Sequence, residues 1–209
     1  MIGTWQCYYL PHEMVYIMPL SIYIKTVMTA LGNSHNHWGL VARLFHWLTA
    51  FIVLAMFILG LWMVDLNYYH QWYKTAPDLH KSAGISLFAF TLLRLIWRFT
   101  HLTPSPLASH SAFEVSVARF THRLLYLLLF GLMLSGYLIS TADGRALDVF
   151  KLFEIPAIIH GIDKQEDIAG TVHLILAIML ISIALLHASA ALKHHFIDKD
   201  RTLKRMLGL

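Results

Sequence analysis

Residues 168–192 contain no Asp, Glu, Lys or Arg. A run of this length can cross a bilayer as a helix, which takes about 20 predominantly apolar residues. Two histidines, His173 and His187, nevertheless lie inside it. Because an ionisable side chain within a membrane is costly, and is a candidate functional group wherever it occurs, these two imidazoles constrain the fold of the whole chain.

The spacing of the two histidines places them on one side of the expected helix. Fourteen residues separate them, which returns a helix to within about 40° of the same face and moves it about 21 Å along its axis. Both rings therefore lie on one stripe, one near each membrane surface. The ordinary interpretation is that each ring forms a hydrogen bond with a neighbouring helix; the other is that they bind a common kind of ligand.

The composition indicates an integral membrane protein. Of the 209 residues, 57% are hydrophobic and 13% are charged, whereas a soluble domain has about 25% charged residues. Three further apolar runs cover residues 44–64, 82–97 (if Arg94 is tolerated) and 124–142. Because lipid admits only helices or closed barrels, and runs of this length are helical, we predict an all-α, four-helix transmembrane bundle forming one domain over residues 33–209. With Cys7 as the single cysteine, an intrachain disulfide framework and a multi-cysteine metal site are excluded.

Residues 1–32 form an N-terminal extension of uncertain status. Its apolar stretch is short and is interrupted by Pro19, and neither a basic region nor a clear cleavage site accompanies it, so a signal peptide is not expected. Two interpretations remain open. The extension is an interfacial or additional membrane segment, or it is not translated and Met28 is the start.

The distribution of basic residues predicts the orientation in the membrane. The loop between the second and third apolar runs contains Arg98, Arg119 and Arg123, and the tail after the fourth run is also basic. The other two loops hold more acidic residues than basic ones. Cytoplasmic loops are rich in Lys and Arg, so both termini are expected in the cytoplasm. The same argument explains the pI of about 9.2 without a nucleic-acid partner.

Four histidines fall at two depths in this topology. His80 begins the second run near the outer surface, level with His173, and His46 begins the first run near the cytoplasm, level with His187. Two histidines from different helices at one depth can hold a flat metal macrocycle between them, as in haem-binding bundles. The sequence has no CxxCH motif for covalent attachment. Any haem held between these helices would therefore be non-covalent and b-type.

Three residues of the second run are candidate contacts of these cofactors. Gly84 follows His80 by four residues and would leave room for a macrocycle, although close helix packing also explains a glycine there. Arg94 follows His80 by fourteen residues and Arg98 by one further turn. Guanidinium groups bind carboxylates well, so both arginines are candidates for haem propionates; the alternative is that they reach lipid headgroups.

Several motifs resemble the bacterial cytochrome b561 family. They are FHW, LHKSAG, VHLILA and LLHASAALKHHFIDKDRTLKRM, and the similarity covers residues 37–209. The resemblance implies a bacterial inner-membrane protein with two bis-histidine haems on the four histidines named above. One branch of the family oxidises superoxide and reduces ubiquinone. In that branch the residue matching His194 and a tryptophan four positions later help to bind quinone, but here Asp198 replaces the tryptophan.

The leading functional hypothesis is therefore a di-haem cytochrome, an oxidoreductase or electron-transfer protein. It would exchange electrons between an outer-side donor, with superoxide as the first candidate, and membrane quinone. A second hypothesis is a membrane anchor that relays electrons for a partner dehydrogenase or hydrogenase. A third, of another class, is a metal-ion or proton transporter that uses histidines along its pathway.

Overall fold

The computed structural model describes residues 6–10, 13–17, 20 and 31–209. Near the N-terminus, β1 (Gln6–Leu10) pairs antiparallel with β2 (Glu13–Ile17), with Gln6 opposite Ile17. The alternative start at Met28 and the break at Pro19 lie outside the described residues. The division at residue 32 therefore stays a prediction.

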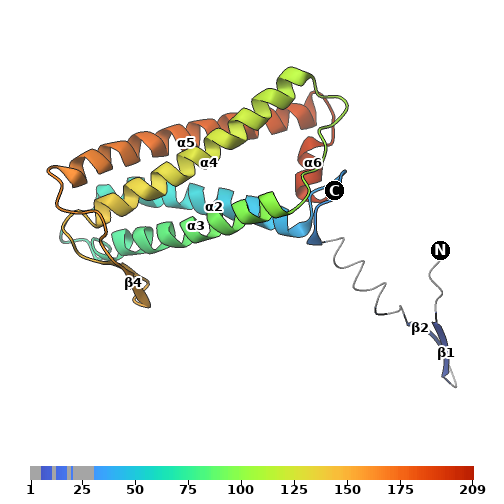
Figure 1. The fold of residues 1–209 in the computed structure, drawn as a ribbon, viewed down its shortest axis with the longest axis horizontal. Helices are drawn as coiled ribbons and strands as arrows, with labels where there is room; N and C mark the ends of the chain where they lie inside the picture. The colour runs from blue at the N-terminus through green and yellow to red at the C-terminus, as the bar shows by residue number, and fades with distance from the viewer. Residues whose placement is uncertain (1–5, 11–12, 18–19, 21–30) are drawn as a thin grey trace.

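Four long helices form the body of the protein: α2 (Leu40–Val64), α3 (Thr75–Thr100), α4 (Ala112–Ser140) and α5 (Gln165–Phe196). In the described part of the chain, these four are long and apolar enough to cross a membrane. Helix α2 packs along α3 and α4 along α5, and contacts between α3 and α4 join the two pairs (Figure 1). The predicted all-α, four-helix membrane fold is confirmed.

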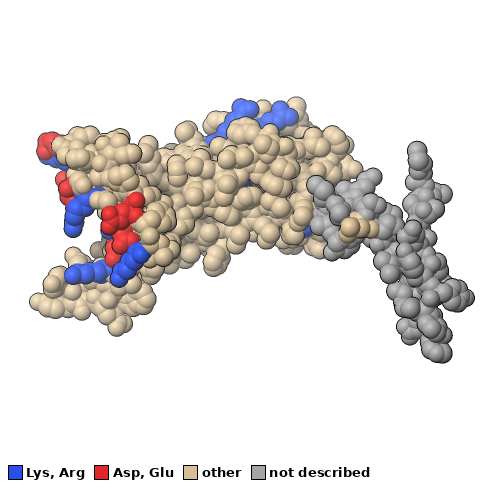
Figure 2. Space-filling view, turned by 60° about the horizontal axis from the view of Figure 1, so that its bottom comes forward, with Lys and Arg blue, Asp and Glu red and all other residues tan. Residues whose placement is uncertain are grey.

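The apolar side chains face outward as well as inward. Phe51, Leu127 and Leu186 are each about two-thirds exposed, as expected where lipid replaces water as the solvent. A smaller apolar core between the helices contains Leu87, Leu128, Leu129, Met133 and Leu180. Figure 2 shows acidic and basic side chains together at one end of the bundle and a broad uncharged surface beside them.

Helix α4 begins well before the uncharged run that predicted it. Ser111 accepts a hydrogen bond from the backbone N–H of Glu114, and the Glu114 carboxylate accepts one from the backbone N–H of Ser111. This reciprocal capping box satisfies donors that a helix N-terminus otherwise leaves unpaired. The helix therefore starts at Ala112, and His122, which precedes the uncharged run, lies within it.

Short elements close both ends of the bundle. At the end where α3 begins, β3 (Leu147–Val149) and β4 (Phe153–Ile155) form a hairpin, and the Phe150 N–H donates to the Ser82 hydroxyl at 3.0 Å. At the opposite end, α6 (Thr202–Leu207) lies across α2, and the Trp47 indole N–H donates to the Met206 carbonyl at 3.0 Å. These contacts tie the connecting segments to the helices that carry the histidines.

Candidate cofactor sites between paired histidines

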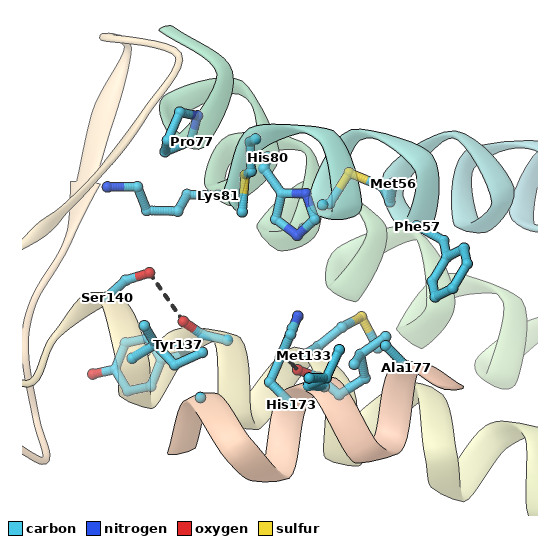
Figure 3. Close-up of a pocket in the computed structure, with 18 of the residues that line it drawn as sticks. Met56, Phe57, Pro77, His80, Lys81, Met133, Tyr137, Ser140, His173 and Ala177 are labelled. Atoms are coloured by element: carbon cyan, nitrogen blue, oxygen red, sulfur yellow. Dashed lines mark hydrogen bonds between the residues drawn. The ribbon is translucent and has the colours of Figure 1, made fainter. Parts of the chain in front are cut away.

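The pair that the sequence predicts near the outer surface consists of His80 on α3 and His173 on α5, and it is called the outer pair below. Its counterpart, His46 with His187, is called the inner pair. Their ring centroids are 6.2 Å apart, and Figure 3 shows the two rings directed toward each other from opposite walls of a cavity. His80 lies in the second turn of α3 and His173 in the third turn of α5. Helices α3 and α5 both begin at the same end of the bundle, and this arrangement brings together two side chains that are 93 residues apart in the sequence.

A hydrogen bond fixes which nitrogen of His173 is free. His173 Nδ1 lies 3.0 Å from the Leu132 carbonyl oxygen of α4. Since a carbonyl only accepts, Nδ1 must carry the hydrogen, and Nε2 keeps its lone pair. Metal-bound histidines usually donate their other N–H to a carbonyl or carboxylate in this way. Across the cavity, His80 Nδ1 is buried and has no hydrogen-bond partner among the described residues.

The cavity around the outer pair has a volume of about 770 Å³, within the range of about 300–1,000 Å³ found for pockets that bind cofactors. Its walls are mainly apolar and include Met56, Met133 and Ala177 (Figure 3). Lys81 and Arg145 also line it. Such a site can enclose a large flat ligand between its apolar walls. Lys81 and Arg145 could then contact polar groups at the edge of that ligand.

Two glycines make room for the outer imidazoles. A Cβ atom on Gly60 would lie 3.2 Å from His80 Cε1, and one on Gly136 would lie 3.1 Å from His173 Cε1. Gly84, which the sequence singled out, lines the same cavity, where a Cβ would meet Met56 Cε at 3.8 Å. The positions where a side chain would press on the histidine rings are therefore Gly60 and Gly136. The sequence analysis did not predict either of them.

The inner pair consists of His46 on α2 and His187 on α5, whose ring centroids lie 6.3 Å apart. This spacing nearly equals that of the outer pair. Arg94 Nη2 lies 3.3 Å from His46 Nδ1, and the Arg94 guanidinium carbon lies 5.4 Å from the Tyr126 ring centroid. Arg94, the charged side chain that the sequence predicts at this level, thus lies beside the inner pair. Arg98 lies one turn further, in the last turn of α3.

His122 is a further member of the inner group that sequence reasoning missed. Its ring centroid is 5.1 Å from that of His187. The uncharged run on α4 starts only after His122, so the run itself did not place this histidine in the helix. The available signal was its spacing, because His122 and Gly136 are fourteen residues apart and share a face of a helix.

His194, the proposed quinone contact, lies apart from both pairs at the end of α5. Its Nδ1 is 2.8 Å from the Asp198 carboxylate and 3.4 Å from that of Asp200. The Lys193 ammonium also donates to Asp198 at 2.8 Å. This hydrogen bond outweighs the effect of desolvation and holds the pKa of Asp198 below its usual value. His194 therefore lies beside a carboxylate that is ionised at neutral pH.

Comparison with known proteins identifies a family for this arrangement. A model of the prokaryotic cytochrome b561 family matches residues 37–209. Cytochrome b561 homolog 2 of Escherichia coli (strain K12) is 50% identical over 176 residues, which are 84% of this chain and 94% of that protein. The probable superoxide oxidase CybB of Yersinia pestis is 30% identical over 181 residues, 83% of this chain and 97% of that protein.

We predict that Gly136→Ala disturbs the outer site. The added Cβ would press on the His173 ring, and such overpacking costs about 1–3 kcal/mol. We expect less haem per chain, measured by pigment extraction, and a changed visible spectrum. Gly131→Ala is the matched control, because its Cβ would lie 3.2 Å from the flexible end of Leu176 on the same helix pair. If both variants bind haem like the parent protein, Gly136 has no role in placing His173.

Proposed function

The chain belongs to the prokaryotic cytochrome b561 family, and from this premise we propose that it transfers electrons across the membrane through two b-type haems, each bound by a histidine pair. Electrons would enter from a donor at the outer side and leave to membrane quinone. The family supports b-type haem and electron transfer across the membrane. Our proposal adds four points to what the family supports: the number of haems, the residues that bind them, the electron donor and the electron acceptor.

The single observation that carries the proposal is the spacing of the two histidine pairs. An imidazole nitrogen lies about 2 Å from a bound first-row metal and about 1 Å from its own ring centre, so two imidazoles on opposite sides of one ion have centroids about 6 Å apart. The measured distances are 6.2 Å for His80 with His173 and 6.3 Å for His46 with His187. Both pairs thus fit a metal between them.

The ligand set favours electron transfer over oxygen binding. Haem iron cycles between two oxidation states and supplies the redox chemistry. Each histidine pair would hold one haem, and two protein ligands for each haem would leave no place for oxygen to bind. The hydrogen bond from His173 Nδ1 to the Leu132 carbonyl would hold that imidazole in the tautomer that binds through Nε2.

Arg94 is proposed to bind a propionate carboxylate of the inner cofactor. If His46 binds metal through Nε2, its Nδ1 carries a hydrogen and cannot accept one from Arg94, because a guanidinium only donates. The 3.3 Å contact between them would then give way, and Arg94 would need an acceptor inside the membrane. Arg98, one turn further, and Gly84, on the wall of the outer cavity, are proposed as further cofactor contacts.

The ligand assignment predicts one haem lost per histidine removed. We expect His173→Ala to lose the outer haem and His187→Ala the inner haem, each keeping one haem per chain by pigment extraction. Arg94→Gln is the comparison, because it removes a charge near His46 but no imidazole. It should retain both haems and lower the midpoint potential of the inner one, since a cation favours the added electron. Two haems with unchanged spectra in either alanine variant would refute the pairing.

The proposed orientation puts the end with β3 and β4 outside. It rests on the basic residues of the tail and of the loop between α3 and α4. Lys81 and Arg145 line the cavity at this outer end and would attract a small anion such as superoxide. Asp78 lies 3.5 Å from Lys81, and Asp143 accepts from Arg145 Nε at 2.6 Å, so this attraction is partly offset. The name of the Yersinia pestis relative supports superoxide as the first donor to test.

Removal of the outer haem should block electron entry from outside. In vesicles with the outer side exposed, we expect His80→Ala to slow reduction of the inner haem by externally generated superoxide by about tenfold or more. Chemical reduction from the quinone side should persist. His70→Ala removes an exposed histidine from the loop between α2 and α3 and should behave like the parent protein. If His80→Ala is reduced from outside at the parent rate, electrons do not pass through this pair.

Quinone is proposed to bind at His194. Asp198 stands where the superoxide-oxidising branch has a tryptophan, but its carboxylate lies 2.8 Å from His194 Nδ1. A carboxylate on one ring nitrogen orients an imidazole and leaves the other nitrogen for a second partner. Asp198 would therefore position His194. With the hydrogen on Nδ1, Nε2 keeps its lone pair and would accept a hydrogen bond from the hydroxyl of quinol, the product of quinone reduction.

The quinone proposal predicts a kinetic defect without a spectral one. His194→Ala should slow quinone reduction severalfold, because the imidazole contact is lost, while both haem spectra stay the same. Stopped-flow oxidation of the reduced protein by quinone measures this rate. His195→Ala removes the adjacent imidazole and should leave the rate unchanged. Equal rates in the parent protein and His194→Ala would rule out this site.

A further inference from the structure

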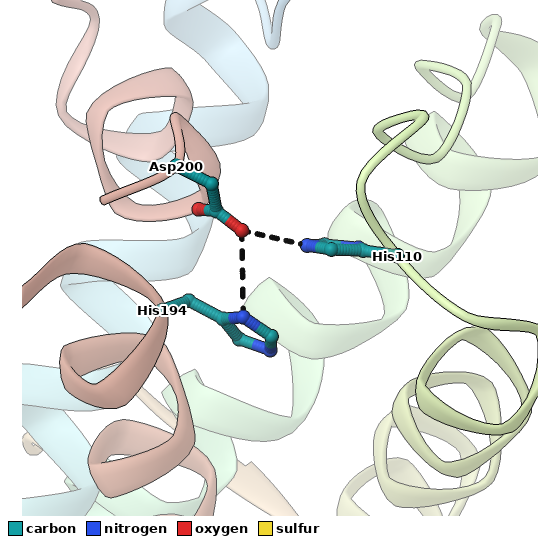
Figure 4. Close-up of side chains that lie close together, drawn as sticks. All are labelled: His110, His194 and Asp200. Atoms are coloured by element: carbon teal, nitrogen blue, oxygen red, sulfur yellow. Dashed lines mark hydrogen bonds and ion pairs between the residues drawn. The ribbon is translucent and has the colours of Figure 1, made fainter. Parts of the chain in front are cut away.

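A cluster of two imidazoles and a carboxylate lies at the end of the bundle where the chain terminates (Figure 4). His110 comes from the loop between α3 and α4, His194 from the last turn of α5, and Asp200 from the turn before α6. Asp200 Oδ2 is 2.9 Å from His110 Nε2 and 3.4 Å from His194 Nδ1. One nitrogen or oxygen from each residue lies within 4.8 Å of the other two.

The cluster is largely shielded from solvent. The side chains of His110, His194 and Asp200 are 16%, 15% and 8% exposed. His194 Nδ1 is buried and makes no hydrogen bond of good geometry with the described residues, although two carboxylates lie close to it. Leaving such a nitrogen unpaired costs free energy. A cation bound among these groups would be coordinated by the lone pair of His194 Nδ1.

The local charge favours a cation. Asp200 accepts a hydrogen bond from the Thr202 backbone N–H at 2.8 Å and lies 2.9 Å from His110 Nε2. A second carboxylate, that of Asp198, lies 2.8 Å from His194 Nδ1. Lys193 lies 2.8 Å from Asp198 and 3.8 Å from Glu114, so the neighbouring ammonium is already directed to two other carboxylates.

We infer that this cluster binds a divalent transition-metal ion of the zinc class, with His110 Nε2, His194 Nδ1 and an Asp200 oxygen as ligands. Imidazole and carboxylate are suitable donors for zinc, and a site with three protein ligands keeps one position for water. Such an ion would be separate from the haem irons. It would link the loop before α4, the end of α5 and the turn before α6, which are up to 90 residues apart.

The inferred metal site does not depend on the proposed function. Zinc would bind His194 Nδ1 in place of the hydrogen that faces Asp198, whereas the quinone contact would use Nε2. Binding can be measured without quinone or an electron donor, so failure of one proposal leaves the other standing. The competing explanation is that the cluster only joins the tail to the loop by hydrogen bonds. In that case zinc would not bind there.

The test is zinc titration of the purified, haem-loaded full chain after treatment with a chelator. Calorimetry and equilibrium dialysis with elemental analysis should give one zinc ion per chain. His110→Ala should weaken binding by about tenfold or more, because even the outer partners of metal ligands contribute about 10–100-fold in affinity. His37→Ala is the matched control, since it removes an exposed histidine that precedes α2.

A second measurement guards against misfolding of the variant. Zinc should raise the thermal midpoint of the parent protein and of His37→Ala, because a ligand of the folded state stabilises it, but not that of His110→Ala. An unchanged haem spectrum will verify the fold of each variant; if His110→Ala loses haem, His110→Gln replaces it. The inference is overturned if the parent protein shows no saturable zinc binding at micromolar concentrations, or if the variant lacking the His110 imidazole binds zinc as the parent does.

Discussion

Imidazoles inside lipid-embedded helices are the constraint on which the rest of this structure depends. Lipid offers no water to a polar side chain, so each ring must find its partners on neighbouring helices. In the bundle, His173 donates to a carbonyl of α4, and the rings of His80 and His173 face each other across an apolar cavity. The helices therefore serve less to bury apolar surface than to hold polar rings at defined positions.

A single spacing organises both levels of the bundle. On each of the four long helices, two of the residues described above are fourteen positions apart, and by the helical repeat each such pair lies on one face, about 21 Å apart along the axis. The pairs are His46 with Gly60, His80 with Arg94, His122 with Gly136, and His173 with His187. Each level thus receives one member from every helix. The outer level contains two histidines and two glycines, and the inner level contains three histidines and an arginine.

The different make-up of the two levels has a chemical consequence. The outer level is lined by glycines that leave space beside the rings, and it opens toward Lys81 and Arg145. The inner level adds a guanidinium and a third imidazole beside the histidine pair. Arg94 would stabilise the reduced form of a cofactor beside the inner pair, whereas Asp78 and Asp143 partly offset the basic residues of the outer level. This difference is in keeping with the proposed direction of transfer.

The sequence by itself determined the fold class, the family and the four histidines at two depths. These follow from uncharged length, helical periodicity and local motifs, which belong to single segments. Helix packing decided the rest. Gly60 and Gly136 matter only because another helix brings a histidine against them, and His122 joins the inner group because a capping box starts α4 early. Likewise, His110 meets Asp200 across 90 residues. The fourteen-residue spacing places residues on one face of a helix, but it does not determine which faces meet when the helices associate.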